Sequence, residues 1–120
     1  MIFRVLSGTS PARPGEVPVV QVTGELDFHN AARLREALVA IHVDSGKGLV
    51  LDLSELTYCD STGITVLIGV HQRAEAAGGR LVLAAMNTEL SRTFAMIGLD
   101  QIFSTEPSVE GAVERLESAG

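Results

Sequence analysis

The feature that most constrains the fold is a pair of short apolar segments joined by a long connection. Residues 49–53 form a nearly continuous apolar run, which is typical of a strand covered on both faces, and another strand is expected over 80–84. The β-branched residues between them would by themselves also suit a strand. A parallel crossover, however, needs about a dozen residues or more, usually as a helix, and the segment from Ser61 to Ala77 supplies that length. The connection therefore predicts a helix, ended by Gly78 and Gly79.

The rest of the chain predicts further strands and helices around this unit. The inward face of the connecting helix is expected to carry Ile64, Leu67, Ile68 and His71. The other elements are, in chain order, strands over Phe3–Leu6 and Val17–Thr23, a helix capped by Asn30 with Leu34, Leu38 and Ile41 inward, a helix capped by Asn87 or Thr88 and ended by Gly98, a brief edge strand at Ile102–Phe103, and a helix from Pro107. The order β-β-α-β-α-β-α-β-α predicts an α/β fold with a mixed sheet, its first strands antiparallel and later ones parallel, packed with about four helices.

Composition narrows the class of protein. The chain has 120 residues, of which 46% are apolar, and it contains no uninterrupted apolar stretch long enough for a membrane span, so we expect one folded domain over residues 1–120. The net charge of -6, with no cluster of Lys and Arg, argues against direct nucleic acid binding. The start of the sequence lacks the features of a signal peptide, and the single cysteine cannot form an internal disulfide. We therefore expect a cytoplasmic protein.

The segment from Cys59 to Gly63 is the strongest candidate for a functional site. It lies where the loop after a buried strand gives way to the connecting helix, so the hydroxyl of Ser61 would stand at a helix N-terminus beside the carboxylate of Asp60. The first N–H groups of a helix are unpaired and carry the positive end of its dipole, so a phosphate can be accommodated there without unfolding. An ordinary N-cap role for Ser61 is the alternative interpretation.

Three further residues belong to this candidate site. Thr62 offers a second hydroxyl and is a second candidate for phosphorylation. Gly63 is less favourable than alanine inside a helix, so we expect it to let a partner's backbone come close. Asp27 follows the second strand, and we expect its loop at the same end of the sheet as Ser61. There, Asp27 either seats a partner or bonds the backbone N–H groups of its own turn.

The sequence argues against an enzyme. Ser61 is not in a nucleophile elbow, and His29, His42 and His71 have contexts typical of surface or packing residues. Cys59 is expected to be a small buried side chain, not a nucleophile, because no arginine follows at the spacing of a phosphatase loop.

No cofactor or metal is expected. One cysteine and scattered histidines give no zinc site. The remaining metal hypothesis is an aspartyl-phosphate receiver, a small α/β switch in which Asp27, Asp52 and Asp60 would gather a magnesium ion. A receiver also needs an acidic pair at its first strand and a lysine late in the sheet, and neither is evident.

Five landmarks in a compatible order of elements carry a family resemblance. They are Gly24-Glu25-Leu26-Asp27, Leu49-Val50-Leu51-Asp52-Leu53, Asp60-Ser61-Thr62-Gly63, Gly78-Gly79-Arg80-Leu81 and Gly98-Leu99-Asp100. From Val19 to about Leu116 the sequence resembles the STAS family of bacterial anti-sigma factor antagonists, which implies a single STAS domain. Phe28 and His29 depart from the smaller residues expected there in the family, which affects partner specificity more than the fold.

The resemblance implies a switch in partner exchange. The serine at the position of Ser61 is phosphorylated by an anti-sigma factor that is itself a protein serine kinase, and a PP2C-type phosphatase removes the phosphate. The unmodified form binds the anti-sigma kinase and so releases sigma factor, whereas the phosphorylated form does not bind. Asp27, Asp60, Thr62 and Gly63 are then expected to contact the partner together with Ser61. The free protein is expected to be a monomer.

A different role is compatible with the same fold. Some STAS domains are accessory subunits of transporters or stress-sensing complexes and need not be phosphorylated, because a fold does not fix a function. Binding to an anti-sigma kinase, with and without ATP, distinguishes the two roles.

Overall fold

The computed structural model describes residues 4–9, 17–39 and 48–118. The elements are β1 (Arg4–Thr9), β2 (Pro18–Leu26), α1 (Ala31–Val39), β3 (Gly48–Asp52), β4 (Leu56–Cys59), α2 (Ser61–Ala76), β5 (Arg80–Ala84), α3 (Thr88–Met96), the 3-10 helix η1 (Leu99–Gln101), β6 (Ser104–Glu106) and α4 (Val109–Ser118). The α/β class and the four α-helices within these ranges confirm the prediction. Phe3, Ile41 and His42, which the sequence analysis assigned, lie outside the described residues.

The sheet has the strand order β1-β2-β3-β5-β6, with β4 paired to β2 beside this path. β1 runs antiparallel to β2, and the other strand pairs of the described residues are parallel. β2 changes partner along its length, since Val19–Gln21 pair with β3 and Gly24–Leu26 pair with β4. The change occurs at a bulge next to Gly24, whose φ of 100° is in the region that favours glycine. The end of β2 therefore lies beside Cys59, directly before α2 begins.

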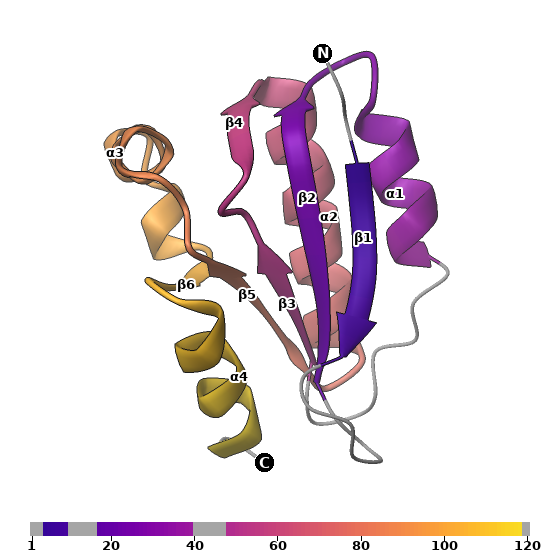
Figure 1. The fold of residues 1–120 in the computed structure, drawn as a ribbon, viewed down its shortest axis with the longest axis vertical. Coiled ribbons are helices and arrows are strands. Elements are labelled where there is room, and N and C mark those ends of the chain that lie inside the picture. Colours follow the sequence, from indigo (N-terminus) through magenta and orange to yellow (C-terminus); the bar gives the residue numbers. More distant parts are fainter. Residues whose placement is uncertain (1–3, 10–16, 40–47, 119–120) are drawn as a thin grey trace.

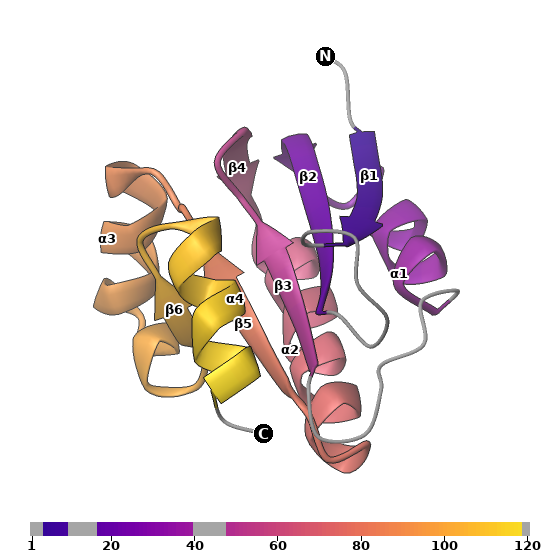
Figure 2. The ribbon, with the colours of Figure 1, turned by 60° about the horizontal axis from the view of Figure 1, so that its bottom comes forward.

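Helices cover both faces of the sheet (Figures 1 and 2). On one face, α1 and α2 pack with α3 over a large core that includes Val22 and Leu51, both fully buried. On the other face, α4 packs over a smaller core, where Leu116 meets Val50 and Val82. The alternation along β2 follows from this arrangement, because successive side chains of a strand point to opposite faces and only the α1–α2 side is deeply covered there.

α2 is buried over a broader face than the sequence predicted. Ile64 and Ile68 pack partly buried against the large core, and the ring of His71 meets Phe103 edge to face with centroids 5.7 Å apart, as expected for an inward face. The buried residues of the helix, however, are Gly63, Val66, Leu67, Val70 and Ala74. Val66 and Val70 lie on the side of α2 that faces α1, and the packing of α1 along this side buries them.

The signals around α3 are confirmed with one correction. Asn87 caps α3 by accepting a hydrogen bond from the N–H of Leu90 at 2.8 Å, and Gly98 ends the helix region with φ of 82°. The predicted edge strand at Ile102–Phe103 instead spans Ser104–Glu106. The chain first forms η1, and Phe103 is consequently buried in the large core.

Candidate functional site

Asp60 organises the end of the molecule at which α2 begins. Its carboxylate accepts hydrogen bonds from the N–H of Gly63 at 2.9 Å and from the N–H of Phe28 at 3.0 Å. Its own N–H donates to the carbonyl of Leu26 at 3.1 Å. The first contact caps α2, and the other two tie the helix start to the end of β2 and to the loop after it. Asp60 is therefore a structural junction between three segments.

Ser61 is the first residue of α2 and is exposed. The alternative interpretation of Ser61 as the N-cap is wrong, since the cap is Asp60. The serine hydroxyl is thus not needed to complete the helix and stands in solvent beside the positive end of the helix dipole. Thr62, the next residue, is partly buried, so of the two hydroxyl residues Ser61 is the more accessible.

Gly63 is buried and has no room for a side chain. A Cβ atom at this position would lie 2.8 Å from both Cγ and the carbonyl oxygen of Leu26 and 2.9 Å from Sγ of Cys59. Gly63 was expected to let a partner's backbone come close, but the structure shows that the chain's own Leu26 and Cys59 make this close approach. The glycine allows the first turn of α2 to pack directly on the ends of β2 and β4.

Asp27 builds the loop between β2 and α1. Its carboxylate accepts from the N–H of His29 at 2.9 Å, and the side chain of Asn30 accepts from the N–H of Asp27 at 2.8 Å. Asn30 also donates its side-chain amide to the carbonyl of Glu25. The interpretation that Asp27 bonds backbone N–H groups of its own turn is confirmed. The bond from Phe28 to Asp60 confirms that this loop lies at the same end of the sheet as Ser61.

Two aromatic side chains stand exposed at this end of the molecule. Phe28 is 74% exposed and Tyr58 is 50% exposed. Phe28 follows Asp27 in the loop, and Tyr58 lies on β4 in register with Glu25 of β2. Exposed aromatic side chains frequently anchor protein interfaces, since they bury a large apolar area at low entropic cost. Phe28 was linked to partner specificity from the sequence, whereas Tyr58, two positions before Asp60, was not singled out.

Cys59 is partly buried, and its thiol has the features of an unreactive group. Burial, followed in size by the charge of the neighbouring Asp60, raises the pKa of the Cys59 thiol to about 12. Its Sγ donates to the carbonyl of Asp60 at 3.7 Å. Because the thiolate is the reactive form of cysteine, the structure supports a packing role.

The magnesium hypothesis is not supported. The carboxylate of Asp52 accepts from the N–H of Ser54 at 3.0 Å, while those of Asp27 and Asp60 are bonded to loop and helix N–H groups. Within residues 4–9, 17–39 and 48–118 no three acidic, cysteine or histidine side chains gather as metal ligands. The carboxylates of the three aspartates therefore accept hydrogen bonds from backbone N–H groups.

The fold and the site together define the class of this protein. The model of the STAS domain matches residues 10–112, and the chain belongs to the STAS domain family. It is 35% identical over 95 residues, which are 79% of this chain and 86% of the relative, to the anti-sigma-B factor antagonist of Bacillus subtilis (strain 168). It also resembles the crystal structure of an anti-sigma factor antagonist from Mycobacterium paratuberculosis, with a TM-score of 0.81 and 28% identity over 97% of this chain and 95% of that one. The predicted resemblance to these antagonists is confirmed.

The STAS fold also occurs in proteins of another kind. The crystal structure of a sulfate transporter family protein from Wolinella succinogenes matches with a TM-score of 0.72 and 19% identity, covering 84% of each chain. At this level of identity the similarity shows a shared fold alone. Among the helices that the structure describes, none combines the length and apolar character needed to cross a bilayer.

Removal of the Asp60 side chain tests its role as a junction. Asp60→Ala is expected to destabilise the fold by about 1 kcal/mol, because it removes a helix cap and leaves the N–H of Phe28 without its acceptor. Asp60→Ser is expected to recover part of the loss, since serine caps a helix but is too short to reach the loop. Urea denaturation measures both variants, and a wild-type midpoint for Asp60→Ala would contradict the assignment.

Proposed function

We propose that this chain is an anti-sigma factor antagonist that acts by binding, not by catalysis. Its partner would be an anti-sigma factor with protein serine kinase activity, and capture of that partner would release sigma factor. The single observation that carries this proposal is the exposed Ser61 at the N-terminus of α2, next to a cap that another residue already supplies. The names of the relatives, which are antagonists of anti-sigma factors, support it.

The proposed contact surface has a neutral hydroxyl at its centre. Phe28, whose N–H donates to Asp60, and Tyr58, on β4 three residues before Ser61, offer exposed apolar area to this surface. Asp27 and Gly63 contribute to this surface through the backbone that they position, and Thr62 lies partly buried beside Ser61. A partner that docks here excludes water from the serine hydroxyl, so any charge added to that hydroxyl would have to be desolvated as well.

Phosphorylation of Ser61 would oppose this docking without unfolding the protein. A phosphoserine carries roughly -1.5 to -2 charges at neutral pH and would lie next to the carboxylate of Asp60. That carboxylate is held by the N–H groups of Gly63 and Phe28, so it does not move away. Like-charge repulsion and desolvation then act on the complex, and about 1.4 kcal/mol suffices for a tenfold loss of affinity. A PP2C-type phosphatase would reverse the modification.

Other parts of the proposal follow from the same scheme. The chain would work in the cytoplasm as a monomer when free, without a cofactor of its own, and ATP would enter only as the substrate of the partner kinase. Thr62 would be at most a minor second site, because it is less accessible than Ser61.

Binding assays with Ser61 variants test the proposal. Purified wild type, Ser61→Ala and Ser61→Asp are mixed with the candidate anti-sigma kinases of the same organism, with and without ATP. Ser61→Ala is expected to bind as wild type does and to stay bound after ATP is added, whereas Ser61→Asp is expected to bind roughly tenfold more weakly. Thr62→Ala serves as the matched control and is expected to lose binding on ATP addition as wild type does. Equal binding of Ser61→Asp and wild type would contradict the switch.

A further inference from the structure

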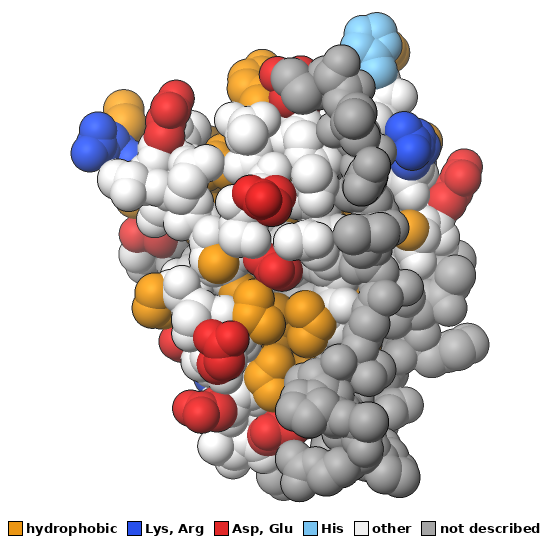
Figure 3. All heavy atoms as spheres, in the orientation of Figure 1, with side chains coloured by type: hydrophobic (Ala, Val, Ile, Leu, Met, Phe, Trp, Pro, Cys, Tyr) orange, Lys and Arg blue, Asp and Glu red, His pale blue; other side chains and the backbone are white. Residues whose placement is uncertain are grey.

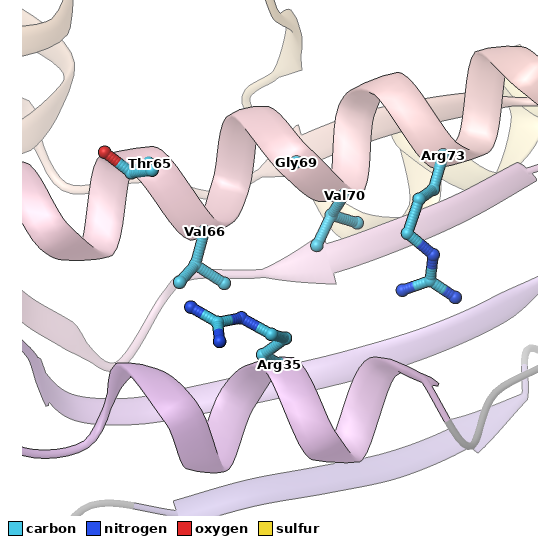
Figure 4. A pocket seen from close by; sticks show the side chains of 6 residues that line it. All are labelled: Arg35, Thr65, Val66, Gly69, Val70 and Arg73. Carbon is cyan, nitrogen blue, oxygen red and sulfur yellow. The ribbon is translucent and has the colours of Figure 1, made fainter.

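A groove runs between α1 and α2, on the side of α2 that faces away from α3. It encloses about 360 Å³ and is lined by Arg35 of α1 and by Thr65, Val66, Gly69, Val70 and Arg73 of α2. Val66 and Val70 are buried and form an apolar floor. In Figure 4 the guanidinium groups of Arg35 and Arg73 extend from the two helices into the space between them. The groove thus combines an apolar base with two cationic groups.

Neither of these arginines forms an ion pair within the part of the chain that the structure describes. Arg115, for comparison, forms an ion pair with Glu106 at 2.9 Å, but no such partner is found for Arg35 or Arg73 among the described residues. Their helical neighbours three and four positions away include no Asp or Glu, so intrahelical ion pairs do not engage them either. Two cations in one groove are therefore free to bind an external anion.

The charge of the whole molecule gives this groove its selectivity. The chain has a net charge of -6, with only 9 Lys and Arg residues. On the face seen in Figure 3, acidic side chains are spread widely and basic ones lie mainly at the margins. A groove with two unpaired arginines is complementary to an acidic segment, whereas much of the remaining surface would repel such a segment.

Gly69 keeps the groove open. A Cβ atom at Gly69 would meet nothing within 4 Å, in contrast to the crowded Gly63 of the same helix. Glycine is less favourable than alanine in a helix interior, and no packing contact within the described chain requires it here. The absence of a side chain at Gly69 therefore leaves space for an apolar side chain from outside the molecule.

We propose that the groove binds an acidic amphipathic helix of the anti-sigma factor that also docks at Ser61. Its carboxylates would pair with Arg35 and Arg73, and an apolar side chain between them would fill the space above Gly69. The groove begins at Thr65, whose hydroxyl donates to the carbonyl of Ser61 at 2.9 Å, so it starts one helical turn from the switch. A partner that covers Ser61 can thus extend along α2 into the groove. This inference rests on the proposed function, because it assigns a second contact to the same partner.

Charge reversal tests the two arginines. The double variant Arg35→Glu/Arg73→Glu is expected to bind the anti-sigma factor at least roughly tenfold more weakly than wild type and to show a smaller dependence of affinity on salt. The matched control is Arg80→Glu/Arg92→Glu, which changes the net charge equally at exposed positions on β5 and α3 and is expected to stay within about twofold of wild type. If the two double variants bind equally, the proposal is overturned.

An uncharged substitution tests whether the space in the groove is needed for binding. Gly69→Leu fills the space and is expected to weaken binding at least roughly tenfold, while its urea midpoint stays at or above that of wild type. Gly69→Ala adds only a methyl group to the groove and is expected to weaken binding less than Gly69→Leu does. Unchanged binding of Gly69→Leu would overturn the proposal. Sedimentation showing that wild type self-associates through Arg35 and Arg73 would overturn it as well. If wild type binds no anti-sigma factor, the proposed function fails as well, whereas wild-type binding that survives both groove variants removes the groove alone.

Discussion

Gly63→Ala is expected to destabilise the protein by about 2 kcal/mol, whereas Gly69→Ala in the same helix is expected to stabilise it by about 0.5 to 1 kcal/mol. The two substitutions add the same methyl group to the same helix. At Gly63 that methyl group would lie 2.8 Å from the carbonyl oxygen of Leu26, which is backbone and cannot rotate away. At Gly69 it meets nothing within 4 Å, so only the gain in helix propensity remains.

The cost at Gly63 extends beyond one contact. The carbonyl of Leu26 also accepts the N–H of Asp60, so a displacement of Leu26 strains the bond that joins β2 to the start of α2. Urea denaturation of the two variants at equal protein concentration measures the pair. A stabilised Gly63→Ala, or a destabilised Gly69→Ala, would show that the packing of α2 differs from the structure described here.

Cys59 is expected to react with iodoacetamide about a thousandfold more slowly in the native protein than in urea, at about pH 8. The thiol is held protonated because burial and the charge of Asp60 raise its pKa to about 12. The native rate should continue to rise with pH above about pH 10, where the rate of the unfolded protein has already levelled off. Equal native and unfolded rates would show that the thiol is open to solvent and ionised normally.

The same raised pKa has a consequence for stability at high pH. The folded state holds its proton more tightly than the unfolded state, so the contribution of Cys59 is complete below about pH 9 and is lost as the pH rises toward 12. Cys59→Ala lacks this titration. The difference in the free energy of unfolding between wild type and Cys59→Ala should therefore shift against wild type over that range, and a constant difference would contradict the assigned pKa.

The parts of the fold that follow from local pattern were predictable from the sequence. The helix over 61–76 was predicted from connectivity. Residue type narrowed the cap of α3 to Asn87 or Thr88, of which Asn87 is the cap, and it predicted the left-handed Gly98. β4 was missed, because it has only four residues and exists through parallel pairing with the end of β2. Pairing between distant segments across a bulge leaves no periodic signal in so short a strand.

The candidate site was predictable in its location but not in its internal roles. Aspartate and serine are equally good helix caps, so residue type alone allowed an N-cap role for Ser61. The hydrogen bond from the N–H of Gly63 to the carboxylate of Asp60 assigns the cap to Asp60 instead. The same holds for Gly63, since a lone glycine reveals a close approach but not which neighbour makes it. The groove beside α2 was not anticipated, because it depends on how α1 crosses α2.

The three hydrogen bonds of Asp60 have a consequence for the timing of the proposed response. Each is formed between groups of the unmodified chain, so the proposed phosphorylation of Ser61 would require no segment to refold or shift register. The proposed signal would then be carried by surface charge and not by a change of shape, with no slow rearrangement between phosphorylation and its effect on binding. The response time would be set by the rates of the kinase and the phosphatase and by the dissociation rate of the complex.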